Sequence, residues 1–360
     1  MKKKIGGAVV IIVIALEIYF HEELLEITGI KSQTVIPYEK GFVKNLRFYD
    51  VYSFEEGFAA IEQNGKWGFI DKQGKIIIKP QFEIVRDFSE GLAAVLHNGS
   101  WGFIDKQGKI MIKPQFGVAW SFSEGMAAVE QNGKWGFIDT LGKIVIKPQF
   151  DFCRDFSEGL AAVEQNEKYD FIDKQGKIII KTQSDLGQDF SEGLAAFKQN
   201  GKWGFIDILG KIIIEPQFDD VGDFSEGLAG VKRNEMWGVI DTTGKIIIKP
   251  QSYYLSYFSE GLARIEQNEK YGFIDKKGKI IIKPQFDYAS YFSEGLARVE
   301  QNEKYGFIDK KGKIIMGPQF ECVREFSEGL VAVRIEGIWG FIDKTGKLII
   351  SAQYDSAHSF

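Results

Sequence analysis

A 34-residue sequence recurs along this chain in unbroken register and determines what the chain can fold into. The motif Phe-Ser-Glu-Gly, or a close variant of it, begins at Phe54 and returns every 34 residues as far as Phe326. Nine copies therefore follow one another without insertion or deletion, and Phe360 stands where the next would begin. Repeats of this size are typical of architectures in which each unit packs only on its neighbours.

Each copy predicts three short β-strands, which in the second copy fall at residues 92–96, 101–104 and 109–113. The first two are joined by Asn98-Gly99, a dipeptide that favours a type I′ hairpin because both residues accept positive φ. In the next turn, Asp105 can accept hydrogen bonds from backbone amides and Gly108 supplies a left-handed residue. In four copies Glu replaces the Gly of Asn-Gly, and there we expect another turn type or strain. These residues are Glu167, Glu235, Glu269 and Glu303.

A large aromatic residue, Trp or Tyr, opens the second predicted strand of every copy. Strand alternation places Trp101 and Phe103 on one face and Gly102 on the other. Large aromatic side chains dominate core burial, so we expect a ladder of core residues rather than a platform for ligands. A hydrophobic content of 44% is ample for such a core. One three-stranded unit cannot bury its own face, whereas stacked units can.

The pattern G-L-A-x-V-x-x-N-G-K-W-G-F-I-D-x-x-G-K-I-I-I-x-P-Q-F closely resembles the WG-repeat (KWG-repeat) family, from Phe54 to Tyr354. The resemblance implies an all-β repeat array of the kind found mostly in bacterial proteins and presumed to mediate interactions. It offers no catalytic residues. The fourth copy departs from the pattern, because Asp170 replaces Gly and Thr182-Gln183-Ser184 replaces Pro-Gln-Phe.

We therefore predict an all-β fold, a tandem array of nine three-stranded β-meander repeats over residues 54–360. Propeller blades usually have about 40–50 residues and number four to eight. The shorter and more numerous units here favour an open superhelical array over a closed propeller-like ring. Residues 21–53 are interpreted as a linker followed by a degenerate terminal repeat, so the two ends of the array either close on each other or are capped separately.

The N-terminus resembles a targeting segment, with three lysines before an apolar run at residues 5–20. Residues 1–20 are predicted to form an apolar helix that serves as a signal peptide or signal-anchor. We favour an uncleaved signal-anchor over a cleaved signal, and both over a buried or peripheral helix. The first two interpretations place the repeats outside the cytoplasm, either membrane-anchored through residues 5–20 or secreted.

No motif for catalysis, a metal or a cofactor stands out in the sequence. The three histidines and two cysteines are scattered singly, and the net charge of −5 gives no reason to expect nucleic acid as a partner. The carboxylates present in every copy could bind calcium in principle, but each turn offers one Asp flanked by Lys. We expect Asp105 to cap its turn, and Glu90 to bond a backbone amide or a lysine. The protein is thus predicted not to be an enzyme.

The strongest functional signal lies in the five residues before each Phe-Ser-Glu-Gly, which differ from copy to copy. Repeat proteins often place binding residues in such variable segments. Six aromatic residues there are candidates for contact with a partner, namely Trp120, Tyr253, Tyr254, Tyr257, Tyr288 and Tyr291. The alternative is that these side chains only pack between units. We predict a binding or scaffold protein for a protein or cell-envelope polymer, or alternatively a carbohydrate-binding module that uses the Tyr and Trp residues.

Overall fold

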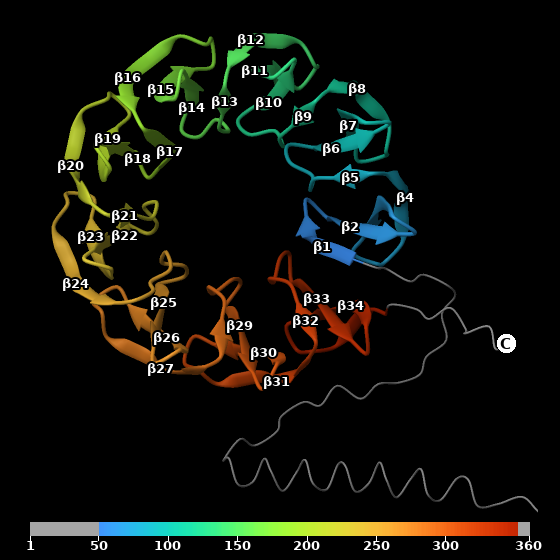
Figure 1. Cartoon of the computed structure of the whole chain (residues 1–360). Coiled ribbons are helices and arrows are strands. Elements are labelled where there is room, and N and C mark those ends of the chain that lie inside the picture. Colours follow the sequence, from blue (N-terminus) through green and yellow to red (C-terminus); the bar gives the residue numbers. More distant parts are fainter. Residues whose placement is uncertain (1–49, 352–360) are drawn as a thin grey trace, which may run out of the picture.

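The repeats form a closed ring of nine antiparallel sheets. The computed structural model describes residues 50–351, and all regular elements in this range are β-strands. The sheets, numbered here as blades 1–9, follow chain order around a central opening (Figure 1). The architecture is all-β and repetitive as predicted, but the expectation of an open superhelical array is wrong.

Each blade runs from an inner strand beside the central opening to an outer strand at the perimeter (Figure 1). The inner strands are β1 (Asp50–Glu55), β5 (Ile84–Val85), β9 (Val118–Ala119), β13 (Phe152–Cys153), β17 (Leu186–Ser191), β21 (Asp220–Val221), β28 (Tyr288–Ala289) and β32 (Cys322–Val323). In blade 7 a single bridge between Leu255 and Ile265 takes the place of the inner strand. The second strands are β2 (Phe58–Gln63), β6 (Leu92–His97), β10 (Met126–Gln131), β14 (Leu160–Gln165), β18 (Leu194–Gln199), β22 (Leu228–Arg233), β25 (Leu262–Gln267), β29 (Leu296–Gln301) and β33 (Leu330–Ile335).

The remaining two strands of each blade correspond to the second and third predicted strands. The third strands are β3 (Lys66–Asp71), β7 (Ser100–Asp105), β11 (Lys134–Asp139), β15 (Lys168–Asp173), β19 (Lys202–Asp207), β23 (Met236–Asp241), β26 (Lys270–Asp275), β30 (Lys304–Asp309) and β34 (Ile338–Asp343). The outer strands are β4 (Ile76–Phe82), β8 (Ile110–Phe116), β12 (Ile144–Phe150), β16 (Ile178–Ser184), β20 (Ile212–Phe218), β24 (Ile246–Ser252), β27 (Ile280–Phe286), β31 (Ile314–Phe320) and β35 (Leu348–Ile350).

The prediction of three strands per unit missed the inner strand, which is built from the variable residues. In blade 3, Val118 and Ala119 pair with Glu130 and Val129 of β10. The variable segment is therefore the first strand of a blade and not merely a loop between units. Residues 50–53, interpreted as part of a terminal repeat, likewise lie in β1 and complete blade 1.

A hairpin turn at Glu-Gly joins the inner strand to the second strand. In blade 3, Glu124 and Gly125 have φ values of 52° and 81°, and Ser123 and Met126 exchange backbone hydrogen bonds across the turn. Positive φ at both central residues defines a type I′ turn, whose twist matches that of the flanking strands. We call this end of the blades the Glu-Gly face, and the opposite end, which carries the Asn-Gly turns, the Asn-Gly face.

The two predicted turns are confirmed. Asn98 and Gly99 have φ values of 52° and 76°, as a type I′ turn requires. In the following turn, the Asp105 carboxylate accepts hydrogen bonds from the amides of Gln107 and Lys109 at 3.0 and 2.9 Å. The equivalent Asp caps its turn in all nine blades, so these carboxylates are occupied by their own backbone.

The Glu variants of the Asn-Gly turn keep the same geometry and therefore carry strain. Glu269 has a φ of 60°, and a side chain in this left-handed region costs roughly 1–2 kcal/mol. We predict that Glu269→Gly raises the free energy of unfolding by about 0.5–1 kcal/mol, after allowing for the greater freedom of Gly in the unfolded chain. Urea unfolding would measure this. Glu294→Gly, at a similar φ of 53°, is the contrasting control and should destabilise, because Glu294 bonds Gly329 and Lys344.

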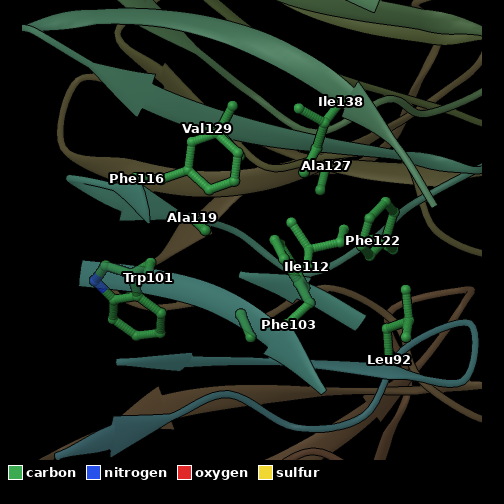
Figure 2. Packing of buried hydrophobic residues seen from close by; sticks show 11 residues of the cluster. Leu92, Trp101, Phe103, Ile112, Phe116, Ala119, Phe122, Ala127, Val129 and Ile138 are labelled. Carbon is green, nitrogen blue, oxygen red and sulfur yellow. The ribbon is translucent and has the colours of Figure 1, made fainter. Parts of the chain in front are cut away.

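The hydrophobic core lies between neighbouring blades. Figure 2 shows side chains of blade 2, among them Trp101 and Phe103, facing Phe122 and Val129 of blade 3. The rings of Phe103 and Phe122 are 4.8 Å apart, and Trp101 is only 7% exposed. The expected aromatic ladder is thus part of the core, with its members buried in four blades and half-buried in the other five. One blade cannot bury its apolar face without the next.

A second set of contacts links the blades along the Glu-Gly face. The Glu90 carboxylate accepts a hydrogen bond from the Gly125 amide of the next blade at 2.9 Å. The Ser89 hydroxyl donates to the carbonyl of Phe122. The glutamate contact recurs at all nine interfaces, and in six of them the glutamate also pairs with a lysine of that same next blade. The expected backbone and lysine contacts of this glutamate are confirmed as a feature of the repeat.

The ring closes where blade 9 meets blade 1. Val51 and Phe54 share a buried cluster with Trp339 and Phe341, and Glu328 accepts from the amide of Gly57 at 3.0 Å. The same contacts that join other blades are therefore present at this seam. Of the two alternatives for the ends of the array, closure on each other is the one found.

The predicted apolar helix at the N-terminus lies outside the described residues. Within residues 50–351, no helix is long and apolar enough to cross a membrane.

Candidate functional site at the inner strands

The inner strands place the variable residues around the central opening of the ring (Figure 1). The third of the five variable positions is buried in every blade, as Val85, Ala119 and Cys153 illustrate, so it serves packing. The fifth position, directly before each Phe, is polar or aromatic in all nine copies. It holds Ser53, Asp87, Ser121, Asp155, Asp189, Asp223, Tyr257, Tyr291 and Glu325.

Blades 4–6 carry three consecutive aspartates at this fifth position, Asp155, Asp189 and Asp223. An ion pair joins Arg154 to Asp189 at 3.8 Å. Burial raises the pKa of Asp155 to about 6, with the charge of Asp189 as the second cause. Burial also raises the pKa of Asp189 and Asp223. This sector of the inner surface therefore holds negative charge that is only partly neutralised.

We predict that Asp155→Asn raises the free energy of unfolding at pH 7.5 by about 1–2 kcal/mol. A pKa shift corresponds to ~1.4 kcal/mol per unit, and the value is reduced because the side chain is partly hydrated. A carboxylate with a raised folded pKa costs stability as pH rises from its unfolded value near 4 to about 6. The gain should therefore vanish at pH 4, which urea unfolding at both pH values would measure. Asp219→Asn, which removes the ion pair with Lys202, should give no gain. An equal gain for both variants would contradict the assignment.

Blades 7 and 8 carry arginines that lie among tyrosines. Arg264 stands over the rings of Tyr254 and Tyr288 at 4.6 and 5.1 Å, and donates to the Ala289 carbonyl of the next blade. Arg298 similarly donates to Val323 in blade 9 at 2.8 Å and to the hydroxyl of Tyr288 at 3.2 Å. These arginines hold neighbouring blades together, and Tyr254 and Tyr288 pack against them.

The six aromatic candidates thus fall into separate groups. Trp120 packs against Trp135 and lies under Arg86, at 4.0 Å from its guanidinium. Tyr254 and Tyr288 surround Arg264 as described. The exposed members are Tyr253, Tyr257 and Tyr291, with 72%, 47% and 36% of their surface accessible. The rings of Tyr257 and Tyr291 lie 5.2 Å apart and form an exposed pair across two blades.

Sequence reasoning missed the charged members of this surface. Arg264 and Arg298 stand where six of the other copies have Ala and one has Gly, so their departure from the repeat was visible in the sequence. Glu55 is a similar departure, because it replaces the Ser of Phe-Ser-Glu-Gly in the first copy. Comparing copies position by position, rather than searching for aromatic residues, would have found all three.

A pocket lies at the ring closure, on the inner side of blades 8, 9, 1 and 2, with a cavity volume of about 500 Å³. We call it the seam pocket. Its lining includes Tyr52, Glu55, Asp87, Tyr291, Arg324 and Glu325. Arg324 already pairs with Asp50 at 2.7 Å and donates to the Val51 carbonyl, and Arg298 reaches Glu325 at 3.5 Å. Among residues 50–351, no group of three or more His, Cys, Asp or Glu could hold a metal ion.

Comparisons with known proteins agree with this architecture. The sequence model of the family described as WG containing repeat matches ten consecutive stretches from residue 41 to residue 360. Among solved structures, the chain is similar to a eukaryotic initiation factor, with a TM-score of 0.58 and 14% identity over 82% of this chain and 95% of that one. This likeness concerns the fold alone.

Two further solved structures are more distant. The chain has a TM-score of 0.46 and 11% identity to the dihydro-heme d1 dehydrogenase NirN, over 82% of this chain and 76% of that one. For Hsv2p of Kluyveromyces lactis the values are 0.40 and 11%, over 63% and 92%. These scores are too low to carry an argument. A comparison with curated proteins found no match.

Proposed function

The chain belongs to the family of proteins with WG containing repeats, and from the ring that its repeats form we propose a non-catalytic binding scaffold that recognises a protein or cell-envelope polymer at its inner strands. The observation that carries this proposal is the contrast between the two parts of each blade. The turns and the core are nearly the same in every copy, whereas the inner strand changes its polar and aromatic residues from blade to blade. Such variation on a fixed frame is typical of a recognition surface.

The exposed pair of Tyr257 and Tyr291 is the best candidate for an anchor of the partner. Tyrosine combines a large apolar ring with a polar end and loses little conformational freedom on binding, and it is therefore frequent in binding hot spots. The neighbouring residues Phe258 and Phe292 are buried and provide the packing between blades. Replacing the tyrosines should therefore leave the fold intact.

The test is a capture experiment in which the full-length chain is immobilised on a resin and incubated with a detergent extract of the cell envelope, and the bound components are identified. Tyr257→Ser and Tyr291→Ser together should abolish the specific capture, and they are mild changes because Ser occupies this position as Ser53 and Ser121. Ile280→Thr, on the exposed part of the outer strand β27, is the matched control and should capture as the parent does. Equal capture by the tyrosine variant and the parent would refute recognition at the inner strands.

A carbohydrate-binding module is the second candidate, favoured by the exposure of Tyr253 and of the Tyr257–Tyr291 pair. Exposed aromatic rings can stack on the apolar faces of sugar rings. Glycan binding by the full-length chain, lost in Tyr257→Ala, would support it. Tyr254→Ala should have less direct effect, because Tyr254 packs against Arg264. No binding above background to a broad glycan set would end this alternative.

The proposal includes export, with residues 5–20 as an uncleaved membrane anchor and the repeats outside the cytoplasm. The support is the lysine-flanked apolar run in the sequence. Mass measurement of the native protein from membrane and soluble fractions tests this. The intact mass in the membrane fraction supports an anchor, a mass shortened by the N-terminal segment supports a cleaved signal, and an intact protein in the cytosol refutes export.

A further inference from the structure

We propose that the seam pocket binds an organic cation that carries N–H donors, supplied by a lysine or arginine side chain of the partner. The inference rests on the proposed function in that it takes the inner strands as the recognition surface. It goes further because it names the chemical group and the residues that receive it, which are Glu55 and Asp87.

The charge of the pocket is the first argument. Its arginine, Arg324, is already paired with Asp50, and Glu325 is near Arg298. Glu55 and Asp87 form no ion pair with any residue in the described range 50–351. The pocket therefore presents two carboxylates whose charge the protein itself leaves uncompensated.

The second argument is an unsatisfied buried acceptor. The Oδ1 atom of Asp87 is buried and has no hydrogen-bond partner within the described part of the chain. A buried acceptor without a donor costs about 1–3 kcal/mol, more for a charged group, and such atoms need an explanation. Burial, with the charge of Glu55 as the second cause, raises the pKa of Asp87 to about 6. A cationic donor in the pocket would balance both charges, and a turn of the Asp87 side chain would bring this oxygen to it.

The third argument is the departure of Glu55 from the repeat. In the other eight copies this position is Ser, and its hydroxyl donates to the Phe carbonyl of the next blade, as Ser89 does to Phe122. Glu55 gives up that hydrogen bond between blades 1 and 2, and its carboxylate stands in the pocket instead. A loss of a structural contact at one place among nine is what a local binding role predicts.

The remaining lining fits a basic side chain better than a bare metal ion. The aromatic residues Tyr52 and Tyr291 line the pocket beside the carboxylates. Aromatic faces attract organic cations and also cover the apolar stem of a lysine or arginine. A divalent metal would need a cluster of oxygen ligands, and no group of three suitable side chains exists within residues 50–351.

The test is a binding titration of the full-length chain in detergent with short peptides, followed by ligand-observed NMR. Acetyl-Gly-Lys-Gly-amide and its arginine analogue are the probes, the norleucine analogue is the neutral control, and cadaverine represents a free amine. We expect at least one basic peptide to bind and the norleucine peptide not to bind. Equal binding of basic and neutral peptides overturns the proposal. Tighter binding of cadaverine than of either peptide overturns the assignment to a partner side chain.

Variants then locate the binding. Glu55→Ser restores the repeat and Asp87→Ser copies Ser53 and Ser121, so both should fold. Each should weaken binding about tenfold, as expected for a charge-assisted hydrogen bond. Glu167→Gly removes one carboxylate from an exposed turn of blade 4, copies the residue of other blades and should leave the affinity unchanged. Unchanged affinity in both seam variants refutes the pocket, while the capture test with Tyr257 and Tyr291 can still succeed on its own.

Discussion

Gly102→Asp is expected to lower the free energy of unfolding by at least ~3 kcal/mol, although blade 4 carries an aspartate at the same position. A Cβ atom on Gly102 would lie 2.5 Å from the carbonyl oxygen of Ile112 and 2.6 Å from the nitrogen of Pro114, which are backbone atoms of the outer strand. The strand cannot yield locally as a flexible side chain could, and the new carboxylate would be buried without a donor. Glycine is thus required by close approach of two strands.

Blade 4 tolerates Asp170 because its outer strand has changed with it. Thr182 replaces the proline, and Gln183 donates to the Asp170 carboxylate from its backbone amide at 3.0 Å and from its side chain at 2.9 Å. Gln183 also adopts a φ of 50°, which differs from the regular outer strand. The departure seen in the sequence is therefore one coordinated exchange of partners across two strands.

The different outer strand of blade 4 suggests a second variant that tests the prediction for Gly102→Asp. Adding Pro114→Thr to Gly102→Asp should recover part of the lost stability, because loss of the proline ring frees the outer strand to bend as it does in blade 4, where the Gln183 amide reaches the Asp170 carboxylate. Gly99→Asp is the control, since a Cβ there meets no atom within 4 Å, and it should cost only about 1 kcal/mol for its positive φ. Urea unfolding of the four proteins measures all of this. A cost for Gly102→Asp no greater than that for Gly99→Asp would contradict the strand-contact argument.

The parts of the fold that could be predicted from sequence are those whose cause is local. Asn98-Gly99 and Asp105 specify their turns through their own backbone preferences, and the alternation of Trp101 and Phe103 with Gly102 specifies a core face. These features depend on a few consecutive residues and recur in every copy. They hold whether the array is open or closed.

The inner strand and the closure of the ring depend on other information. The inner strand pairs through backbone atoms, as Val118 does with Glu130, so apart from its buried third position its side chains need not follow a common pattern across copies. Its register is set by the type I′ turn at Glu124-Gly125, and Glu-Gly is a weaker hairpin signal than Asn-Gly because Glu rarely adopts a positive φ. Closure depends on the angle between neighbouring blades, which no single repeat specifies.

The candidate site shows the same division. Aromatic content alone identified Tyr257 and Tyr291, which are exposed, but also Tyr254 and Tyr288, which pack around Arg264. An aromatic residue in a variable segment can either contact a partner or pack between blades. Which of the two it does depends on the residues that surround it in the folded protein. A charged residue that breaks the repeat, such as Glu55, is a more specific signal because it gives up the hydrogen bond that Ser makes to the next blade in the other eight copies.

Phe54→Ala is expected to cost about 3–5 kcal/mol and to open the ring at its seam. The Phe54 side chain is fully buried and meets the ring of Phe341 at 4.9 Å, the contact that closes blade 9 onto blade 1. Phe122→Ala removes the equivalent contact with Phe103 between blades 2 and 3. The covalent chain joins blades 2 and 3 directly, whereas within residues 50–351 blades 9 and 1 are held by side-chain contacts and hydrogen bonds alone.

The two variants should therefore lose similar transfer free energy and differ in where the structure opens. Hydrogen exchange followed by mass spectrometry should show rapid exchange across blades 1 and 9 in Phe54→Ala, because loss of the seam contact releases both ends of the array. In Phe122→Ala the increase should be smaller and confined to the neighbourhood of blades 2 and 3. If the two variants gave the same extent of exchange, the seam would be no weaker than any other interface, and closure would depend on the shared core and not on this phenylalanine. Because the proposed cation site spans this seam, Phe54→Ala should also abolish binding of the basic peptide, whereas Phe122→Ala should preserve it.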